Sequence, residues 1–187
     1  MGKVISLINT TPDGFVDAQY AVIDAQYFEF IHHLLAETRT VAFGRHSFEL
    51  FQGVWLSRLE DENATPWQVK MAKALADIPK EVYSSTLKTT TWNNSHIVPK
   101  IDPERLNAYK QQAQGGLLTF ASLNLVASFT EMNLIDDYYF CIQPLLAGKG
   151  GVRLFDKVSL ESSRPLKYVA SKQLKSGVNI IHYQSQN

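Results

Sequence analysis

The chain has 187 residues, of which 45% are hydrophobic, and its 18 Lys and Arg residues balance 18 Asp and Glu residues. This composition is too apolar for intrinsic disorder, and zero net charge excludes the basic character by which dedicated nucleic-acid-binding proteins attract phosphate backbones. The longest unbroken apolar run, Tyr138 to Ile142, is far shorter than the ~18–20 residues that cross a bilayer, so we expect neither a nucleic-acid partner nor a membrane segment.

The first two thirds of the chain alternate short apolar strands with helices. Lys3 to Ile8 is rich in β-branched residues and predicts a buried strand, which the turn residues from Thr11 to Gly14 end. After Asp24, which can cap a helix, apolar residues recur at i, i+3, i+4, i+7 and i+8 and predict one buried helical face. By the same criteria we expect strands at 38–43, 81–84 and 95–98, helices at 45–56 and 67–76, and a polar surface loop at 58–66.

Strands dominate the last third of the chain. The segment 102–104 (DPE) is typical of a helix start, and Gly115-Gly116 ends that helix. Two apolar segments, 167–174 and 178–183, flank Ser176-Gly177 and predict an antiparallel hairpin. Before this hairpin we expect strands at 117–120 and 135–143, a helix that follows 121–122, and a glycine-rich loop at 144–151.

This order of elements predicts the fold class. Strands that alternate with helices form a mostly parallel central sheet with helices on both faces, and the hairpin adds antiparallel strands at one edge. We therefore expect residues 1–187 to form a single α/β domain. Ligands of such sheets bind at the carboxyl ends of the strands, so the residues that follow each strand are the candidates for a site.

Three strand ends carry similar candidate residues. In each, a small or hydroxyl-bearing residue follows a short apolar strand and leads into a helix or loop. Free backbone N–H groups and the positive end of the helix dipole suit phosphate there, and hydroxyls and an arginine add donors. Together they suit a ligand with several phosphates, such as a dinucleotide, although glycine and serine also follow strands where no ligand binds. The candidates are Gly44, Arg45, His46 and Ser47; Ser84, Ser85 and Thr86; and Ala121, Ser122, Leu123, Asn124 and Leu125.

The absence of several known sequence motifs excludes some classes of binding site. No G-x-G-x-x-G follows the first strand and no G-x-x-x-x-G-K-[ST] occurs, which excludes an ordinary Rossmann fingerprint and a P-loop. The five histidines lack the spacing of metal ligands, so we expect no metal site. The only cysteine, Cys141, lies in an apolar strand segment, which indicates a buried inert thiol rather than a nucleophile. With no intramolecular disulfide and no apolar signal-peptide core, the expected location is cytoplasmic.

Seven segments, taken in chain order, resemble motifs of the dihydrofolate-reductase-like family to which the reductase domain of riboflavin biosynthesis belongs. Thr11 to Val16 (TPDGFV) resembles S-x-D-G-[FYR]-[IV], and Gly44 to Glu49 (GRHSFE) is similar to G-R-x-T-[YF]-E. Tyr83 to Leu87 (YSSTL) resembles [VF]-x-S-R-T-L. Each motif is weak alone, but the matches keep the family's order from residue 3 to residue 183. The other four similar segments are 115–125, 134–138, 144–155 and 176–178.

The resemblance implies a dihydrofolate-reductase-like fold and a stand-alone, homodimeric, NADPH-dependent reductase. Its substrate would be a small heterocycle or sugar phosphate, as for the 5-amino-6-(5-phosphoribosylamino)uracil reductase of riboflavin biosynthesis. By the match, Gly44 to Ser47 lie against the cofactor pyrophosphate, Ser84 to Thr86 near the adenosine ribose and its 2′-phosphate, and Ala121 to Leu125 beside the phosphate on the nicotinamide side. Asp13 and Gly14 border the substrate, with Asp13 as the catalytic residue.

Two positions depart from the family's motifs. Ser85 stands where the family usually has arginine, the side chain that reads a 2′-phosphate by its charge and fork geometry, so NADH is an alternative cofactor. Ala121 stands where the family usually has glycine, and its methyl group could push a pyrophosphate away. These departures support a second hypothesis, a non-catalytic ligand-binding protein that retains the reductase fold. A third hypothesis is a different α/β phosphate-binding enzyme.

Two residues have both a functional and a structural interpretation. Asp13 either anchors the substrate or delivers a proton, or it is a turn residue that bonds to its own backbone before Gly14. Phe51 recurs with Phe48 and Trp55 at helical spacing, which favours core packing. One of these rings could also form the wall of a pocket for a planar substrate, and we assign that role to Phe51.

Overall fold

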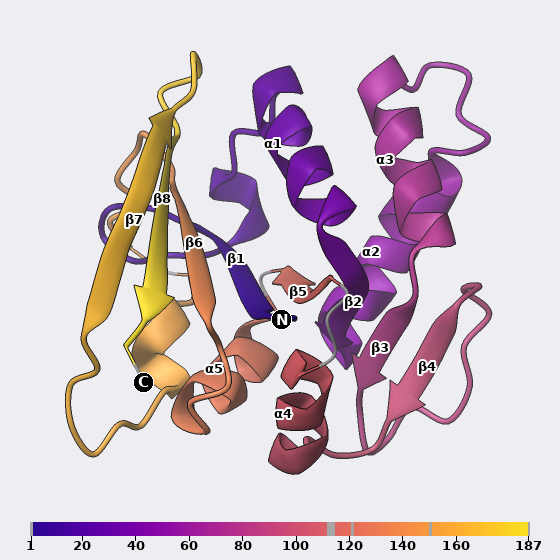
Figure 1. Ribbon diagram of the computed structural model, residues 1–187. Coiled ribbons are helices and arrows are strands. Elements are labelled where there is room, and N and C mark those ends of the chain that lie inside the picture. The colour runs from indigo at the N-terminus through magenta and orange to yellow at the C-terminus, as the bar shows by residue number, and fades with distance from the viewer. Residues whose placement is uncertain (1, 112–114, 121, 150, 187) are drawn as a thin grey trace.

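The computed structural model describes residues 2–111, 115–120, 122–149 and 151–186. Its strands are β1 (Val4–Thr10), β2 (Thr38–Gly44), β3 (Lys80–Tyr83), β4 (Ser95–Val98), β5 (Gly116–Phe120), β6 (Asp137–Ile142), β7 (Leu166–Gln173) and β8 (Asn179–Ser185). They form one eight-stranded sheet in the order β4-β3-β2-β5-β1-β6-β8-β7 (Figure 1). Every pair from β4 to β6 in this order is parallel, and β8 pairs antiparallel with both β6 and β7.

Helices cover both faces of the sheet, because successive side chains of each strand point to opposite sides. On one face, α1 (Ala25–Ala36), α2 (Arg45–Ser57) and α3 (Pro66–Asp77) pack around strand residues such as Val41 and Phe43. On the other face, α4 (Pro103–Gln111) and α5 (Leu123–Glu131) cover Ala42 and Leu117. The predicted mostly parallel sheet with helices on both faces and a C-terminal antiparallel hairpin is confirmed.

The limits of most elements agree with the sequence pattern to within two residues. The predicted strand 135–143 begins at Asp137 instead, because the chain before it turns back onto α5, where the Leu134 N–H donates to the Phe129 carbonyl (2.9 Å). Two 3₁₀ helices, η1 (Ala18–Tyr20) and η2 (Leu154–Lys157), are absent from the sequence prediction, since a single turn shows no periodicity.

Side chains cap the N-termini of α1, α3 and α4. The Tyr27 N–H donates to Asp24 Oδ1 (2.8 Å), which confirms the predicted cap of α1. Thr65 forms a capping box at α3, and the Glu104 N–H donates to Asp102 Oδ1 (3.0 Å) at α4. No side chain caps α2 or α5, and these two helices begin directly after β2 and just beyond β5.

The C-terminal hairpin extends the sheet beyond its helical layers (Figure 1). A turn at Gly177, with φ of +90°, joins its two strands. All eight residues of the edge strand β7 are exposed, including the apolar side chains of Leu166, Tyr168 and Val169. In the part of the chain that the structure describes, no helix combines the length and the apolar character that crossing a membrane requires.

Candidate functional site

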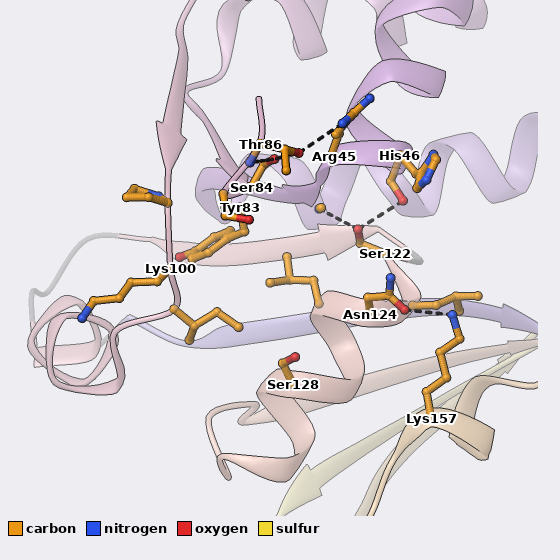
Figure 2. Close-up of a pocket in the computed structure, with 17 residues that line it drawn as sticks. Arg45, His46, Tyr83, Ser84, Thr86, Lys100, Ser122, Asn124, Ser128 and Lys157 are labelled. Atoms are coloured by element: carbon orange, nitrogen blue, oxygen red, sulfur yellow. Dashed lines mark hydrogen bonds between the residues drawn. The ribbon is translucent and has the colours of Figure 1, made fainter. Parts of the chain in front are cut away.

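A cleft of about 580 Å³ opens at the carboxyl ends of β3, β2 and β5, which are neighbours in the sheet (Figure 2). This volume lies within the range of ~300–1,000 Å³ that is usual for small-molecule sites. The parallel strands bring the three predicted strand ends to one place. Ala121 lies outside the described residues. All the other residues predicted to bind the cofactor line this cleft: Gly44, Arg45, His46, Ser47, Ser84, Ser85, Thr86, Ser122, Leu123, Asn124 and Leu125.

The Ser122 hydroxyl joins two of these strand ends. Its Oγ accepts the Gly44 N–H (2.6 Å) and donates to Ser47 Oγ (3.1 Å), and Ser122 is only 3% exposed. A Cβ on Gly44 would lie 2.9 Å from Ser122 Oγ, closer than real side chains approach. Glycine is therefore required at position 44 by the close contact, whereas its φ of −79° suits any residue.

The N-termini of α2 and α5 both face this cleft without a side-chain cap. Ser122 occupies the N-cap position of α5, but its hydroxyl is engaged with Gly44 and Ser47 and does not bond to its own helix. Among the described residues, no side chain accepts a hydrogen bond from the first backbone N–H groups of either helix, and two positive dipole ends point to one place. This arrangement suits an anion that bridges the two helices.

The third strand end forms a compact hydroxyl-rich turn. Ser84 Oγ accepts the N–H groups of Thr86 (3.2 Å) and Leu87 (3.0 Å). Arg45 Nη1 donates to Thr86 Oγ1 (3.1 Å), and Arg45 Nε donates to Glu49 Oε1 (2.9 Å). Glu49 and Thr86 therefore hold the Arg45 guanidinium across the mouth of the cleft.

The charge of the cleft differs from that of the chain. Arg45, Lys100 and Lys157 line it, and the described lining residues include no carboxylate. The Lys157 ammonium donates to Asn124 Oδ1 (3.0 Å). In a chain with no net charge, this local excess of positive charge favours an anionic ligand.

Sequence reasoning missed the two lysines of the cleft. Lys100 follows the predicted strand at 95–98, so a fourth strand end could have been examined by the same criterion. Lys157 comes from η2, which carries no sequence signal, and reaches the cleft through the fold of the segment after β6.

Asp13 lies outside the described lining of this cleft and holds a loop in place. Its Oδ2 accepts the Gly148 N–H (2.8 Å), and its Oδ1 accepts the Thr11 hydroxyl (2.6 Å) and the Ala147 N–H (3.2 Å). The Thr11 hydroxyl and then the Gly148 N–H lower the pKa of Asp13 to about 2. The carboxyl is therefore ionised at neutral pH and has no proton to deliver in this arrangement. These bonds tie the turn to the loop at 147–148, a contact that neither interpretation of Asp13 included, and the catalytic role stays a prediction.

The other two predicted substrate residues also lie outside the described lining of the cleft. Gly14 follows Asp13 with φ of +89°, a conformation that favours glycine. Phe51 packs in the core, with ring centroids 5.1 Å from Phe43 and 5.6 Å from Phe120. The core interpretation accounts for these contacts, and a substrate contact of Phe51 stays a prediction.

A second polar network lies farther along the same edge of the sheet, at the carboxyl ends of β1 and β6. Asn9 Nδ2 donates to the Tyr27 hydroxyl (2.8 Å), and Gln143 Nε2 donates to Asn9 Oδ1 (3.0 Å). Gln143 is 1% exposed, and its Oε1 accepts the Val22 N–H (2.8 Å). Beside it, Cys141 is fully buried, as predicted, and burial raises the pKa of its thiol to about 12. Among the described residues, no three His, Cys, Asp or Glu side chains meet in a way that would hold a metal ion.

Comparisons with known proteins place this fold and this cleft in a family context. The family model described as the RibD C-terminal domain matches residues 3–180. YyaP, an uncharacterized protein of Bacillus subtilis (strain 168), is 22% identical over 188 residues, which cover 97% of this chain and 94% of YyaP.

Solved structures resemble the whole chain. A protein assigned to riboflavin biosynthesis from Shewanella sp. PV-4 has a TM-score of 0.71 at 18% identity, with 99% of each chain covered. Dihydrofolate reductase from Enterococcus faecalis, complexed with NADP(H) and RAB-propyl, has a TM-score of 0.61 at 11% identity, with 100% of this chain and 98% of that chain covered. The predicted dihydrofolate-reductase-like fold is thereby confirmed.

Proposed function

Because this chain belongs to the RibD C-terminal domain family, we propose that it is an NADPH-dependent reductase of a small heterocyclic or sugar-phosphate substrate, similar to 5-amino-6-(5-phosphoribosylamino)uracil. One observation carries the proposal: two uncapped helix N-termini open into one cleft whose described lining has cations and no carboxylate. Such a cleft suits the pyrophosphate of a dinucleotide. NADH stays the alternative cofactor, because Ser85 replaces the family's usual arginine.

Different residues of the cleft would bind different parts of the dinucleotide. The backbone N–H groups at the starts of α2 and α5 would hold the pyrophosphate, and the Ser122 hydroxyl fixes the distance between the two helices through Gly44. The hydroxyl-rich turn at 84–86 would bind one end of the dinucleotide, and Lys157 with Asn124 the other. This division accounts for a cleft that is elongated across three strand ends.

The bound nicotinamide would supply hydride, so the chain's own contribution is orientation and electrostatics. We place the substrate toward the carboxyl ends of β1 and β6, beside the hydrogen-bonded network of Asn9, Tyr27 and Gln143. The loop at 144–148, which Asp13 ties to the end of β1, borders this region. An anchoring role of Asp13 toward substrate is part of the proposal.

A titration of the purified protein with NADPH and NADH tests this function. Saturable binding at micromolar concentrations should quench tryptophan fluorescence and raise Tm by mass action. Oxidation of the bound cofactor should then follow the addition of a pyrimidine or pteridine substrate. Binding without turnover on any such substrate would favour the non-catalytic protein, and no binding of either dinucleotide would refute the proposed function.

We also propose that the protein is a homodimer and that it is located in the cytoplasm. The support for a dimer is β7, an eight-residue edge strand whose side chains are all exposed and whose backbone offers unpaired donors and acceptors. The support for a cytoplasmic location is the single unpaired thiol of Cys141, which is usual in a reducing compartment.

A further inference from the structure

The two lysines of the cleft lie at opposite ends of it and have different surroundings. Figure 2 shows Lys100 on one side and Lys157 on the other, with Ser122 and Asn124 between them. Lys157 is held by Asn124 Oδ1 (3.0 Å). Across the described parts of the chain, no hydrogen bond or ion pair engages the Lys100 ammonium, and Lys100 is exposed. Lys100 is therefore available to a ligand without first giving up a partner.

The sheet places the backbone at Lys100 beside the hydroxyl-rich turn, and Figure 2 shows the Lys100 side chain extending away from Ser84 and Thr86, so its ammonium would have to rotate to reach a ligand there. Tyr83 of β3 is paired with Val98 of β4, and the Ser84 N–H donates to the Val98 carbonyl (3.0 Å). The chain therefore leaves the sheet toward Lys100 directly alongside the segment that begins with Ser84 and Ser85. The Ser85 side chain is exposed in the same cleft, at the position where an arginine would have carried the charge.

The neighbouring charged groups have other partners. Arg45 is engaged by Glu49 and Thr86. Lys88 donates to the Ser85 carbonyl (3.3 Å) and lies outside the described lining of the cleft. Asp102, two residues after Lys100, accepts the N–H groups of Glu104 and Arg105 at the start of α4, so its carboxylate serves as a helix cap.

We propose that Lys100 recognises the 2′-phosphate of NADPH at the Ser85 end of the cleft and so selects NADPH over NADH. The inference rests on the proposed function. NADH has a 2′-hydroxyl at that position and gains nothing from a cation. A lysine reads the phosphate as a point charge and replaces the fork of an arginine, while the Ser85 hydroxyl adds a neutral donor. Lys100, which follows β4, thus supplies the positive charge that an arginine at position 85 would have provided after β3.

The test compares four ligands on wild-type protein and on Lys100→Met, which keeps the aliphatic stem and removes the charge. NADPH and NADH measure the preference, and adenosine 2′,5′-bisphosphate with 5′-AMP isolates the adenosine end from the nicotinamide. The wild type should bind NADPH more tightly than NADH. Lys100→Met should weaken NADPH and the bisphosphate by about tenfold, as expected for loss of one charge-assisted contact, and leave NADH and 5′-AMP within about twofold.

Four further variants test whether the effect is specific to the charge at position 100. Lys100→Arg should retain the preference for NADPH, and Lys167→Met on the distant edge strand β7 is the control for removal of a surface charge. Lys88→Met tests the neighbouring cation. In Lys100→Met, the added substitution Ser85→Arg should restore the preference. Melting temperatures without ligand show that each variant is folded.

The outcomes distinguish a failure of this inference from a failure of the proposed function. A wild type that binds neither dinucleotide would refute the proposed function and the inference with it. A wild type that binds NADPH, with an unchanged preference in Lys100→Met or with the loss in Lys88→Met instead, would refute only the role of Lys100.

Discussion

Gly44 and Ser122 show how single residues set the geometry of the cleft. The serine hydroxyl takes the glycine N–H at the end of β2 and thereby leaves the start of α5 uncapped. The same hydroxyl thus both ties two strand ends together and keeps backbone donors available to a ligand. A side chain at position 44 would have to displace that hydroxyl, because its Cβ would lie 2.9 Å from Ser122 Oγ.

Gly44→Ala should lower both stability and dinucleotide binding. The displaced Ser122 hydroxyl loses its bond to the half-buried Gly44 N–H, which costs about 1 kcal/mol in the free energy of unfolding. The matched control is Gly53→Ala in α2, the helix that Gly44 precedes, where a Cβ meets nothing within 4 Å. This substitution should raise the free energy of unfolding by roughly 0.5–1 kcal/mol. Urea denaturation and cofactor titration of both variants measure these effects. Equal behaviour of the two variants would contradict the argument.

Lys80 is a buried cation outside the cleft. It is 1% exposed, and its ammonium donates to the carbonyls of Leu75 (2.6 Å) and Ile78 (2.8 Å) at the end of α3. The ammonium also lies 4.8 Å from the centroid of the Trp92 ring. Burial, only partly offset by Asp77, lowers the pKa of Lys80 from 10.5 to about 8.

This pKa predicts a pH-dependent difference between wild type and Lys80→Met. Between pH 8 and pH 10.5 the unfolded chain holds the Lys80 proton and the folded chain releases it, so the stability of the wild type rises with pH relative to the variant. Urea denaturation of both proteins below pH 8 and near pH 10.5 measures the difference. Groups common to the two proteins cancel in this comparison. A constant difference would show that Lys80 keeps an ordinary pKa on folding, and a difference that falls with pH would show that folding raises it.

At the scale of elements, two aspartates fix the segment after β6 against the segment after β1. Asp13 accepts the N–H groups of Ala147 and Gly148, and Asp17 Oδ2 accepts the Val152 N–H (2.9 Å). Because η2 follows directly, these bonds also position Lys157 at the cleft. Both aspartates therefore contribute to the site indirectly, because they fix the segment that carries Lys157.

Asp13→Asn should loosen this segment without unfolding the sheet. An amide keeps one acceptor oxygen and loses the negative charge, so exchange of the Gly148 amide hydrogen should become faster, while Asp17→Asn should affect Val152 instead. The same loosening should appear in the wild type at low pH. The pKa of Asp13 falls from 3.8 to about 2 on folding, so the unfolded chain binds more protons in this window, and the anchoring is complete above pH 3.8 and lost toward pH 2. Unchanged Gly148 exchange in Asp13→Asn would contradict this role.

The sequence predicts elements better than it predicts the contacts between them. The ends of β2, β3 and β5 could be predicted because apolar strands followed by glycine or serine leave a local signal, and sheet topology brings such ends together. The contact of Asp13 with Gly148 joins residues 135 positions apart, and no local pattern encodes it. Lys157 was missed for the same reason, since its place depends on how the preceding loop is held.

At the scale of the whole molecule, the free edge of the sheet is the feature that predicts assembly. Tyr168 and Val169 of β7 are 56% and 42% exposed, and β7 is the outermost strand at this end of the sheet (Figure 1). If two copies pair through this strand, Val169→Lys should convert the dimer to a monomer in sedimentation velocity. Leu146→Lys, in a loop where leucine is 74% exposed, is the control and should leave the dimer intact. A monomeric wild type would refute the proposed homodimer.

The uneven distribution of charge also makes the molecule an electric dipole. Glu49 pairs with Arg45 beside the cleft, whereas Lys100 and Lys157 bring an excess of positive charge to it, and in a chain of zero net charge an equal excess of carboxylates lies elsewhere. An approaching polyanion is thus turned toward the cleft as it nears, although the protein exerts no net attraction on it from afar. We expect the rate of encounter with such a ligand to fall as salt shortens the Debye length, which is about 8 Å at physiological ionic strength, and stopped-flow fluorescence would measure it.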